Sequence, residues 1–134
     1  MNEPHGLTIS TWAATVQKVI TAIRNAGATS QMILLPGTDY ASAGNVISNG
    51  FDALIAVKNP DSTATNLIFD VHKYLDSDNS GTCAECVTNN IDRAFGPLVT
   101  WLCSNNRQAL LSETGGGNVA SCAIYMCQQL DYLK

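Results

Sequence analysis

Glu3 and Glu113 are the residues of this sequence whose type and position best fit acid–base chemistry. Glu113 directly follows a short apolar run at residues 108–112, and Glu3 precedes the helical pattern that starts at Thr8. In parallel α/β folds, active residues gather at the carboxyl ends of strands, because the loops there vary above a fixed scaffold. Two carboxylates at such strand ends are the groups that glycoside hydrolysis needs, one as acid and base and the other as nucleophile.

A histidine and a tyrosine belong to the same predicted rim. The apolar run at residues 67–71 ends in His72, and Tyr74 lies two positions further on. Each residue alone has a simpler interpretation. A glutamate at a strand end is more often a solvated loop residue. His72 alone is more simply a partner of a neighbouring carboxylate, and Glu3 alone is a complement to the dipole of the helix that follows it. The joint occurrence of these residues at strand ends favours the chemical interpretation.

Hydrophobic spacing indicates the elements that must position these side chains. Apolar residues at helical spacing predict helices over residues 8–26, 41–49, 90–104 and 118–133. Short apolar runs predict buried strands at residues 31–35, 67–72 and 108–112, whereas 54–57 is ambiguous. Helices and strands therefore alternate along the whole chain. This order is typical of a parallel sheet covered by helices, so the predicted fold class is α/β.

The length and the charge balance exclude several classes of protein. A chain of 134 residues is too short for a complete (β/α)8 barrel, which needs roughly 200 to 250 residues. Only 13% of the residues are charged and the net charge is −4, so no basic footprint for nucleic acid or anionic lipid is present. No apolar run approaches the roughly 18 residues of a membrane span. We expect a single domain over residues 1–134 that binds a neutral substrate, with neither nucleic acid nor membrane as partner.

The five cysteines favour oxidising surroundings, because they are frequent for a cytosolic protein of this size. Cys83 and Cys86 have zinc or redox spacing, but zinc needs four ligands and the sequence has two histidines, so disulfide bonding is preferred and no metal is predicted. A calcium loop at residues 76–81 is rejected because its last ligand position is Val87. The odd count leaves at least one thiol without an internal partner. The amino terminus lacks a secretory signal, which leaves either a signal upstream of this sequence or reduced thiols.

The motifs around these residues resemble glycoside hydrolase family 5, and within it the fungal endo-β-1,4-glucanases. Asn2-Glu3-Pro4 is similar to the family's Asn-Glu-Pro, and residues 11–24 resemble the helix that follows it. Residues 35–37 are similar to the end of barrel strand five, 70–76 to strand six, and 112–117 to strand seven with its nucleophile. The resemblance extends over the chain and implies a partial TIM (β/α)8 barrel, from the end of strand four to the helix after strand seven.

The resemblance implies a role for each side chain on the rim. Glu3 is the general acid and base and Glu113 the nucleophile in a retaining hydrolysis of internal β-1,4-glucosidic bonds. Asn2 is expected to hydrogen-bond the sugar 2-hydroxyl. His72 and Tyr74 are expected to orient the carboxylates and to help keep one of them protonated. The implied partner is cellulose or another β-1,4-glucan, and no cofactor is implied.

An aromatic residue and three absent residues complete the comparison with the family pattern. Tyr40 lies where related enzymes place an aromatic ring at the cleft, so it is expected to stack on a glucosyl ring. Family members also have an arginine and a histidine from early strands and a tryptophan after strand eight. These three have no counterpart in this sequence.

The fungal pattern also implies a disulfide between Cys86 and Cys122 and an extracellular location. Cys127 pairs further downstream in that pattern, so it is expected to be the odd thiol here. Cys83 and Cys103 fall outside the pattern.

Two functions stay open at the level of sequence. The chain is either a retaining endo-β-1,4-glucanase or a catalytically weak or inactive barrel fragment that only binds β-glucan. The second follows because preorganised electrostatics usually supplies the largest share of catalysis, and part of the family's site is missing. A partial barrel also exposes two strand edges and apolar surface, which predicts a homo-oligomer such as a dimer.

Overall fold

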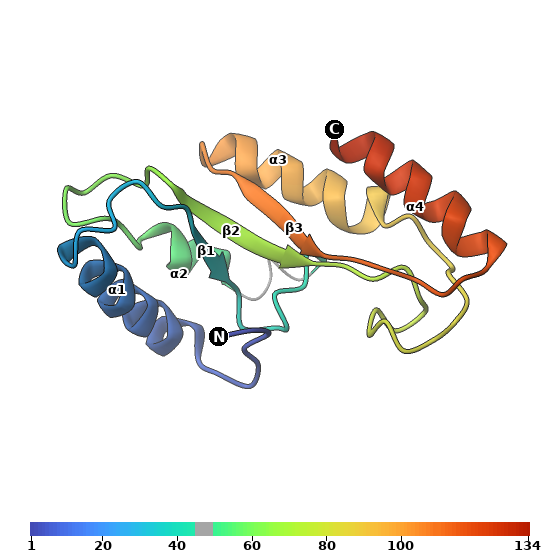
Figure 1. The fold of residues 1–134 in the computed structure, drawn as a ribbon, viewed down its shortest axis with the longest axis horizontal. Coiled ribbons are helices and arrows are strands. Elements are labelled where there is room, and N and C mark those ends of the chain that lie inside the picture. Colours follow the sequence, from blue (N-terminus) through green and yellow to red (C-terminus); the bar gives the residue numbers. More distant parts are fainter. Residues whose placement is uncertain (45–49) are drawn as a thin grey trace.

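The structure is a computed structural model that describes residues 1–44 and 50–134. Its centre is a parallel sheet of three strands in the order β1 (Ile33–Pro36), β2 (Leu67–His72) and β3 (Ala109–Glu113). Helices alternate with the strands (Figure 1): α1 (Ile9–Asn25), α2 (Phe51–Ile55), η1 (Ile91–Phe95) with α3 (Gly96–Ser104), and α4 (Ala120–Leu133). The predicted α/β class and the alternation of helices with strands are confirmed.

The hydrophobic core lies between one face of the sheet and helices α1, α2 and α3. Phe69 of β2 is at its centre and is fully buried. Its ring stacks on Phe51 of α2 with centroids 4.4 Å apart and meets the edge of Trp101 of α3 at 5.4 Å. Because side chains alternate along a strand, the opposite face of β2 presents Ile68, Asp70 and His72.

Helix α1 begins and ends close to the predicted positions. Thr8 occupies the N-cap position, although its side chain caps no backbone amide. The chain turns at Gly27 with φ +95°, a conformation that glycine adopts readily after a helix. The Trp12 indole N–H donates to the Pro36 carbonyl at 2.8 Å, which ties α1 to the end of β1. The apolar spacing of this helix includes Val19 with Trp12 and Val16, but Val19 is 51% exposed whereas the other two are buried.

The segment between β1 and β2 differs from the sequence-based expectation of a helix at 41–49. Residues 41–44 form turns, and Ser42 forms a parallel bridge with His72. The backbone of residues 41–43 hydrogen-bonds to His72: the His72 N–H donates to the Ala41 carbonyl at 2.8 Å, and the Ala43 N–H donates to the His72 carbonyl at 3.0 Å. Residues 45–49 lie outside the described residues. The ambiguous residues 54–57 overlap the end of α2.

The helix predicted over residues 90–104 is divided into a π-helical turn and an α-helix. In η1, the Phe95 N–H donates to the Asn90 carbonyl, five residues earlier, at 3.1 Å. Pro97 near the start of α3 has no N–H to donate, so the hydrogen-bond ladder is interrupted where the two helices join. Leu98 is buried as expected, whereas Val99 is 40% exposed.

A disulfide between Cys86 and Cys122 joins the segment after β2 to the first turn of α4. This confirms the pairing that the family resemblance implies. Two glycines make room beside it, because a Cβ on Gly116 would lie 2.3 Å from the Cys86 sulfur and one on Gly117 would lie 2.2 Å from the Ala84 carbonyl oxygen. Among the described residues the free, exposed thiols are Cys83, Cys103 and Cys127.

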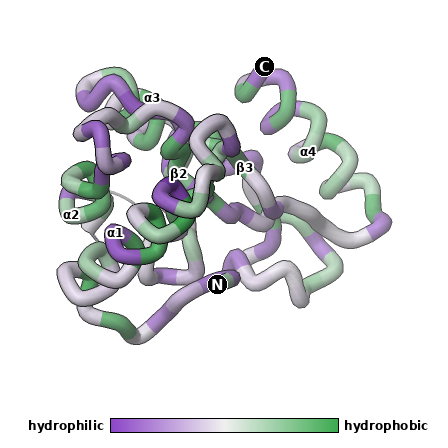
Figure 2. The backbone as a smooth tube through the Cα atoms, turned by 60° about the vertical axis from the view of Figure 1, so that its left-hand side comes forward, coloured by the Kyte–Doolittle hydropathy of each residue, from purple (hydrophilic) through white to green (hydrophobic). Residues whose placement is uncertain are grey.

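The sheet is open at both edges within the described chain. Both β1 and β3 pair with β2 alone among the described strands. Helix α4 stands apart from α1 and α2 in two views (Figures 1 and 2). Leu110 on β3 and Ile124 and Leu130 on α4 are about half exposed. The described chain therefore presents apolar side chains near the β3 edge.

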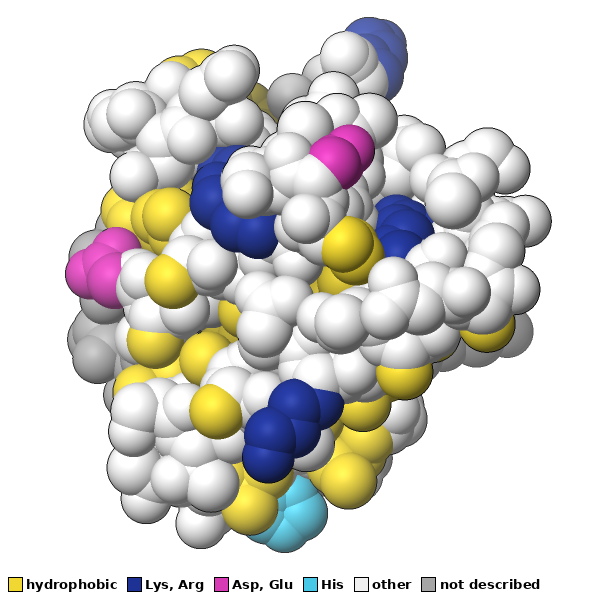
Figure 3. All heavy atoms as spheres, turned by 90° about the vertical axis from the view of Figure 1, so that its left-hand side faces the viewer, with side chains coloured by type: hydrophobic (Ala, Val, Ile, Leu, Met, Phe, Trp, Pro, Cys, Tyr) yellow, Lys and Arg dark blue, Asp and Glu magenta, His cyan; other side chains and the backbone are white. Residues whose placement is uncertain are grey.

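Charged and apolar side chains are mixed on the face that includes the amino ends of the strands. Figure 3 shows Lys and Arg side chains lying apart from one another there, among neutral and hydrophobic ones. Within residues 1–44 and 50–134, no helix has the length and apolar character needed to cross a membrane.

Candidate active site

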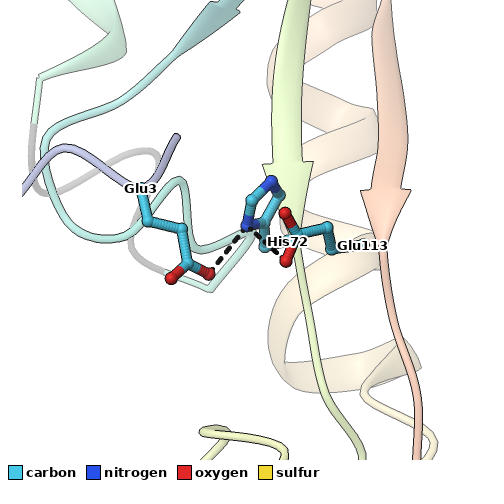
Figure 4. A group of neighbouring side chains, drawn as sticks. All are labelled: Glu3, His72 and Glu113. Carbon is cyan, nitrogen blue, oxygen red and sulfur yellow. Dashed lines mark hydrogen bonds and ion pairs between the residues drawn. The ribbon is translucent and has the colours of Figure 1, made fainter. Parts of the chain in front are cut away.

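Glu3, His72 and Glu113 converge at the carboxyl ends of the strands (Figure 4). The Nδ1 atom of His72 lies 2.9 Å from Oε1 of Glu3 and 3.5 Å from Oε2 of Glu113. One oxygen of each glutamate and one ring nitrogen of His72 all lie within 4.8 Å of one another. The His72 side chain is buried, whereas about a third of each glutamate side chain is exposed. The two carboxylates can therefore meet a ligand from solvent while the ring supports them from behind.

A bulge in β3 aims Glu113 at this cluster. Val71 of β2 pairs with Leu111 of β3. The next residue, His72, pairs with Glu113, so Ser112 is an extra residue with no paired residue on β2. Because successive residues point to opposite faces, a shift of one residue reverses the face that a side chain uses. The extra residue thus brings Glu113 to the same face as His72.

The N-terminal segment brings Glu3 to the strand ends although Glu3 belongs to no strand. The Tyr40 backbone N–H donates to the Pro4 carbonyl at 3.2 Å, and His5 and Asp39 form an antiparallel bridge. Glu3 itself has φ +43°, in the left-handed region that few non-glycine residues adopt. Such backbone strain persists only where the surroundings hold it. Here the contacts of Pro4 and His5, directly after Glu3, anchor the turn that carries the carboxylate toward His72.

Tyr74 supplies a hydrogen-bond donor to Glu113. Its hydroxyl donates to Oε2 of Glu113 at 3.2 Å. Asn79 and Asn90 hold the Tyr74 backbone, because the Tyr74 N–H donates to Oδ1 of Asn79 at 3.0 Å and the Asn90 side-chain amide donates to the Tyr74 carbonyl at 2.9 Å. Burial raises the pKa of Tyr74, and the hydrogen bond to Glu113 raises this pKa further. The phenol therefore stays protonated and acts as a donor at neutral pH.

Asp70 is a third carboxylate beside His72, and it was not predicted as a site residue from the sequence. Its Oδ2 lies 3.8 Å from Nε2 of His72, and its side chain is 13% exposed. Its Oδ1 accepts a hydrogen bond from the Ser112 hydroxyl. The alternation of β2 already places Asp70 on the face of His72, and this pattern is the signal that identifies it.

A groove of about 420 Å³ lies beside Glu3. Loops at the carboxyl ends of the strands form it, and most of its side chains are polar. Its lining residues are Glu3, Asp39, Tyr40, Ser42, Tyr74, Asp78, Asn79 and Ser80. Most of these lie in loops without a periodic pattern, which is why the sequence indicated only Glu3 and the two tyrosines.

Of the remaining predicted residues, Tyr40 lines this groove. Tyr40 is half exposed, and the His5 ring stacks on it with centroids 4.5 Å apart and an angle of 11° between the ring planes. Asn2 is exposed next to Glu3 in the chain. The structure therefore places the predicted aromatic residue in the same groove as Glu3.

Among the described residues, two groups of side chains bring possible metal ligands within 4.8 Å of one another. They are Glu3, His72 and Glu113, and Asp76, Asp78 and Cys83. In the first group the three side chains already contact one another. In the second, Oδ2 of Asp76 accepts the Cys83 backbone N–H at 3.1 Å. Contacts within the protein account for both groups, and the expectation of a site without metal stays a prediction.

A family model described as cellulase (glycosyl hydrolase family 5) matches residues 1–134. The chain belongs to glycosyl hydrolase family 5. This family 5 chain is 71% identical to endoglucanase EG-II of Hypocrea jecorina, over 100% of this chain and 32% of that protein. It is 49% identical to the manganese dependent endoglucanase Eg5A of Phanerodontia chrysosporium, over 100% of this chain and 35% of that protein. The chain thus spans about a third of the length of these curated relatives.

Solved structures of related proteins define which part of the family 5 fold is present. The crystal structure of Cel5A (EG2) from Hypocrea jecorina matches with a TM-score of 0.99 at 71% identity, over 100% of this chain and 41% of that one. The structure of XacCel5A in complex with cellopentaose matches with a TM-score of 0.86 at 35% identity, over 99% of this chain and 43% of that one. The open three-stranded sheet is therefore part of a TIM barrel, as predicted.

Proposed function

We propose that this chain carries the acid–base residue and the nucleophile of a retaining endo-β-1,4-glucanase, namely Glu3 and Glu113. One observation carries the proposal: an oxygen of Glu3 and an oxygen of Glu113 lie within 4.8 Å of each other beside His72. Retaining glycosidases hold their two carboxyl groups about 5 to 5.5 Å apart, whereas inverting enzymes leave about 6.5 to 9.5 Å for a water molecule. The short separation favours the retaining mechanism.

In the first step, the Glu113 carboxylate attacks the anomeric carbon of a glucosyl unit while Glu3 donates its proton to the glycosidic oxygen. The bond from that carbon to the glycosidic oxygen breaks, its electron pair stays on the oxygen, and a glycosyl ester forms on Glu113. Tyr74 and His72 both lie beside Oε2 of Glu113. They hold this oxygen, so the other carboxylate oxygen is free to attack.

In the second step, Glu3 acts as the base. As a carboxylate it takes a proton from a water molecule, whose oxygen attacks the anomeric carbon and displaces Glu113. The anomeric carbon is inverted twice, so the product keeps the β configuration. Glu3 ends the cycle protonated and Glu113 ends it ionised, as both began.

A neutral β-1,4-glucan is the substrate that the groove and the relatives support. The half-exposed Tyr40 ring offers a surface for a glucosyl ring, and Asp39 and Asp78 offer acceptors for sugar hydroxyls. Asn2, next to Glu3, hydrogen-bonds the 2-hydroxyl of the sugar in this proposal, and such a contact strengthens in the transition state. The relatives named above are endoglucanases, and XacCel5A was solved with cellopentaose.

The test is hydrolysis of a soluble cellulose derivative, measured as new reducing ends. Glu113→Gln and Glu3→Gln should each lower the rate by about a hundredfold to ten-thousandfold. Glu85→Gln is the matched control, because Glu85 is exposed, accepts a hydrogen bond from Ser121 and does not line the groove beside Glu3. If the chain and Glu113→Gln are equally inactive while β-glucan still binds, the chain is a binding fragment and the proposal fails.

The open sheet edges support self-association, and we include a homodimer in the proposal. Unpaired strand edges favour pairing with another chain, and exposed apolar side chains favour burial. Leu110 on β3 and Ile124 on α4 are 45% and 57% exposed. Light scattering at micromolar concentration should give a mass above 14.2 kDa. A strictly monomeric species would contradict this part of the proposal.

An extracellular location is the last part of the proposal. The Cys86–Cys122 disulfide supports it, because disulfides form and persist in oxidising compartments. Protein recovered from culture medium should have three thiols that react with an alkylating reagent in denaturant, one for each free cysteine. Five reactive thiols would show that the disulfide is absent.

A further inference from the structure

The extra residue of the β3 bulge, Ser112, also makes a side-chain contact across the sheet. Its hydroxyl donates a hydrogen bond to Oδ1 of Asp70 on β2. The other carboxylate oxygen of Asp70 faces Nε2 of His72 at 3.8 Å. The backbone irregularity that turns Glu113 toward His72 is therefore linked, through two side chains, to the ring of His72 itself.

We propose that Asp70 and Ser112 are positioning residues of the candidate active site. Their hydrogen bond holds the β3 bulge and with it the direction of Glu113, and Asp70 fixes the His72 ring so that Nδ1 faces both glutamates. Ser112 contacts Asp70, and Asp70 in turn faces the His72 ring. They therefore act through Glu113 and His72 and not on the substrate.

The bulge is stable only if its extra residue, Ser112, makes a favourable contact. In a regular ladder Ser112 would lie opposite His72, and Glu113 would point to the other face of the sheet. A bulge disrupts the ladder locally and re-aims a side chain, so other contacts must favour it. Hydrogen bonds to a carboxylate are roughly twice as strong as neutral ones. The bond from Ser112 to Asp70 thus stabilises the register in which Glu113 meets His72.

The His72 ring has a carboxylate opposite each of its nitrogens. Nδ1 lies 2.9 Å from Glu3 and 3.5 Å from Glu113, and Nε2 faces Asp70. Only 4% of the His72 side chain is exposed, so water offers the ring few alternative partners. A rotated ring would lose the carboxylate at one or both nitrogens. Asp70 therefore disfavours rotation of the ring away from Glu3.

The kinetic test compares three variants of the chain and rests on the proposed function. Ser112→Ala removes the donor, Ser112→Thr keeps a hydroxyl, and Asp70→Asn keeps an acceptor but removes the charge that faces Nε2. On a soluble cello-oligosaccharide, Ser112→Ala and Asp70→Asn should lower kcat about tenfold to a hundredfold, the usual effect of a misplaced reacting group, and leave KM within about twofold. Ser112→Thr should restore most of kcat.

A matched control separates this effect from the loss of any serine hydroxyl. Ser104 on α3 donates its hydroxyl to the Thr100 carbonyl of its own helix at 2.9 Å. Ser104→Ala should leave kcat and KM unchanged. Circular dichroism of all variants verifies that each is folded before its kinetics are compared.

A second readout needs no activity. Nitrogen NMR of the histidine rings, with His5→Asn to assign the two histidines, reports the partners of each His72 nitrogen. Asp70→Asn should move the Nε2 signal and Ser112→Ala should move the Nδ1 signal, whereas Ser104→Ala should move neither. If the chain does not hydrolyse glucan but these signals respond as stated, the proposed function fails and the positioning role stands.

Two results would overturn the positioning role. One is that Ser112→Ala and Asp70→Asn keep both the kcat and the His72 signals of the unchanged chain. The other is a loss of kcat in Ser112→Ala that Ser112→Thr does not restore, because the hydroxyl is then not the group that matters.

Discussion

The hydroxyl of Tyr74 hydrogen-bonds to Oε2 of Glu113 at 3.2 Å. The two residues lie at the carboxyl ends of neighbouring strands, since Tyr74 follows β2 and Glu113 is the last residue of β3. The Tyr74 ring is held in place by close packing, because a Cβ on Gly81 would lie 2.7 Å from it and one on Gly115 would lie 3.4 Å from it. The donor is thus fixed before any substrate binds.

Removal of this donor should weaken catalysis while the fold is kept. A hydrogen bond to a charged group contributes about 1.5 to 3 kcal/mol, so Tyr74→Phe should lower kcat by roughly tenfold to a hundredfold. Tyr132→Phe is the control, because Tyr132 is 43% exposed on α4. The measurement is steady-state hydrolysis of a cello-oligosaccharide. Equal kcat values for the two variants would show that the hydrogen bond to Glu113 does not contribute.

The Cys86–Cys122 disulfide should be a major source of stability. It closes a loop over a sequence separation of 36 residues. The chain-entropy relation gives about 4 kcal/mol for a loop of this length. The double variant Cys86→Ser, Cys122→Ser should lose about that much free energy of unfolding in a denaturant titration. Cys103→Ser, which replaces an exposed free thiol, should stay close to the unchanged chain.

The aromatic cluster around Phe69 should dominate the stability of the helix-covered face. Phe69→Ala should lower the free energy of unfolding by about 3 to 5 kcal/mol, because it leaves a cavity among Phe51 and Trp101. Val19→Ala removes apolar atoms from a side chain that is 51% exposed, and should cost about 0.5 kcal/mol or less. Comparable losses in the two variants would contradict the position of the core.

Asp76 should make the stability depend on pH at the acidic end. Burial opposes ionisation of Asp76, but hydrogen bonds from the backbone N–H groups of Cys83 and Gly81 outweigh it and lower its pKa below the usual 3.8. A carboxyl group with a lowered pKa stabilises the fold above its ordinary pKa, and this contribution is lost as the pH falls through the folded value. Asp76→Asn should therefore be less stable at neutral pH.

The difference between the unchanged chain and Asp76→Asn should shrink as the pH falls below 3.8. Denaturant titrations over a pH series measure it. Asp131→Asn is the control, because Asp131 is 73% exposed and pairs with Lys134 on the surface. A difference between Asp76→Asn and the unchanged chain that does not vary with pH would contradict the role of the backbone hydrogen bonds.

The fold follows from the sequence where the apolar spacing is regular. The strands around Phe69 and Leu110 and the helix that contains Trp12 were predicted within one or two residues, because burial of a strand or a helical stripe sets their pattern. The helix around Asn90 and Pro97 was predicted as one element, because spacing alone does not report a π-helical turn. The segment at 41–44 contacts His72, a residue remote in sequence, and no local pattern indicates that.

The candidate site was only partly accessible from sequence. The carboxyl ends of strands, together with the family resemblance, identified Glu3, His72 and Glu113. The bulge at Ser112, which turns Glu113 toward His72, depends on the register between two strands, and a single sequence does not specify register. The alternation of β2 places Asp70 on the face of His72, but its contact with Ser112 depends on the same register and could not be predicted.

The account is tested most directly by trapping the glycosyl ester that it requires. A 2-fluoro cellobioside with a good leaving group slows the second step, so the ester accumulates and the peptide that carries it can be identified by mass spectrometry. The retaining mechanism predicts one glycosyl group on the peptide that contains Glu113, and none in Glu113→Gln. A label on any other residue, no label at all, or hydrolysis that yields the α-anomer first would contradict it.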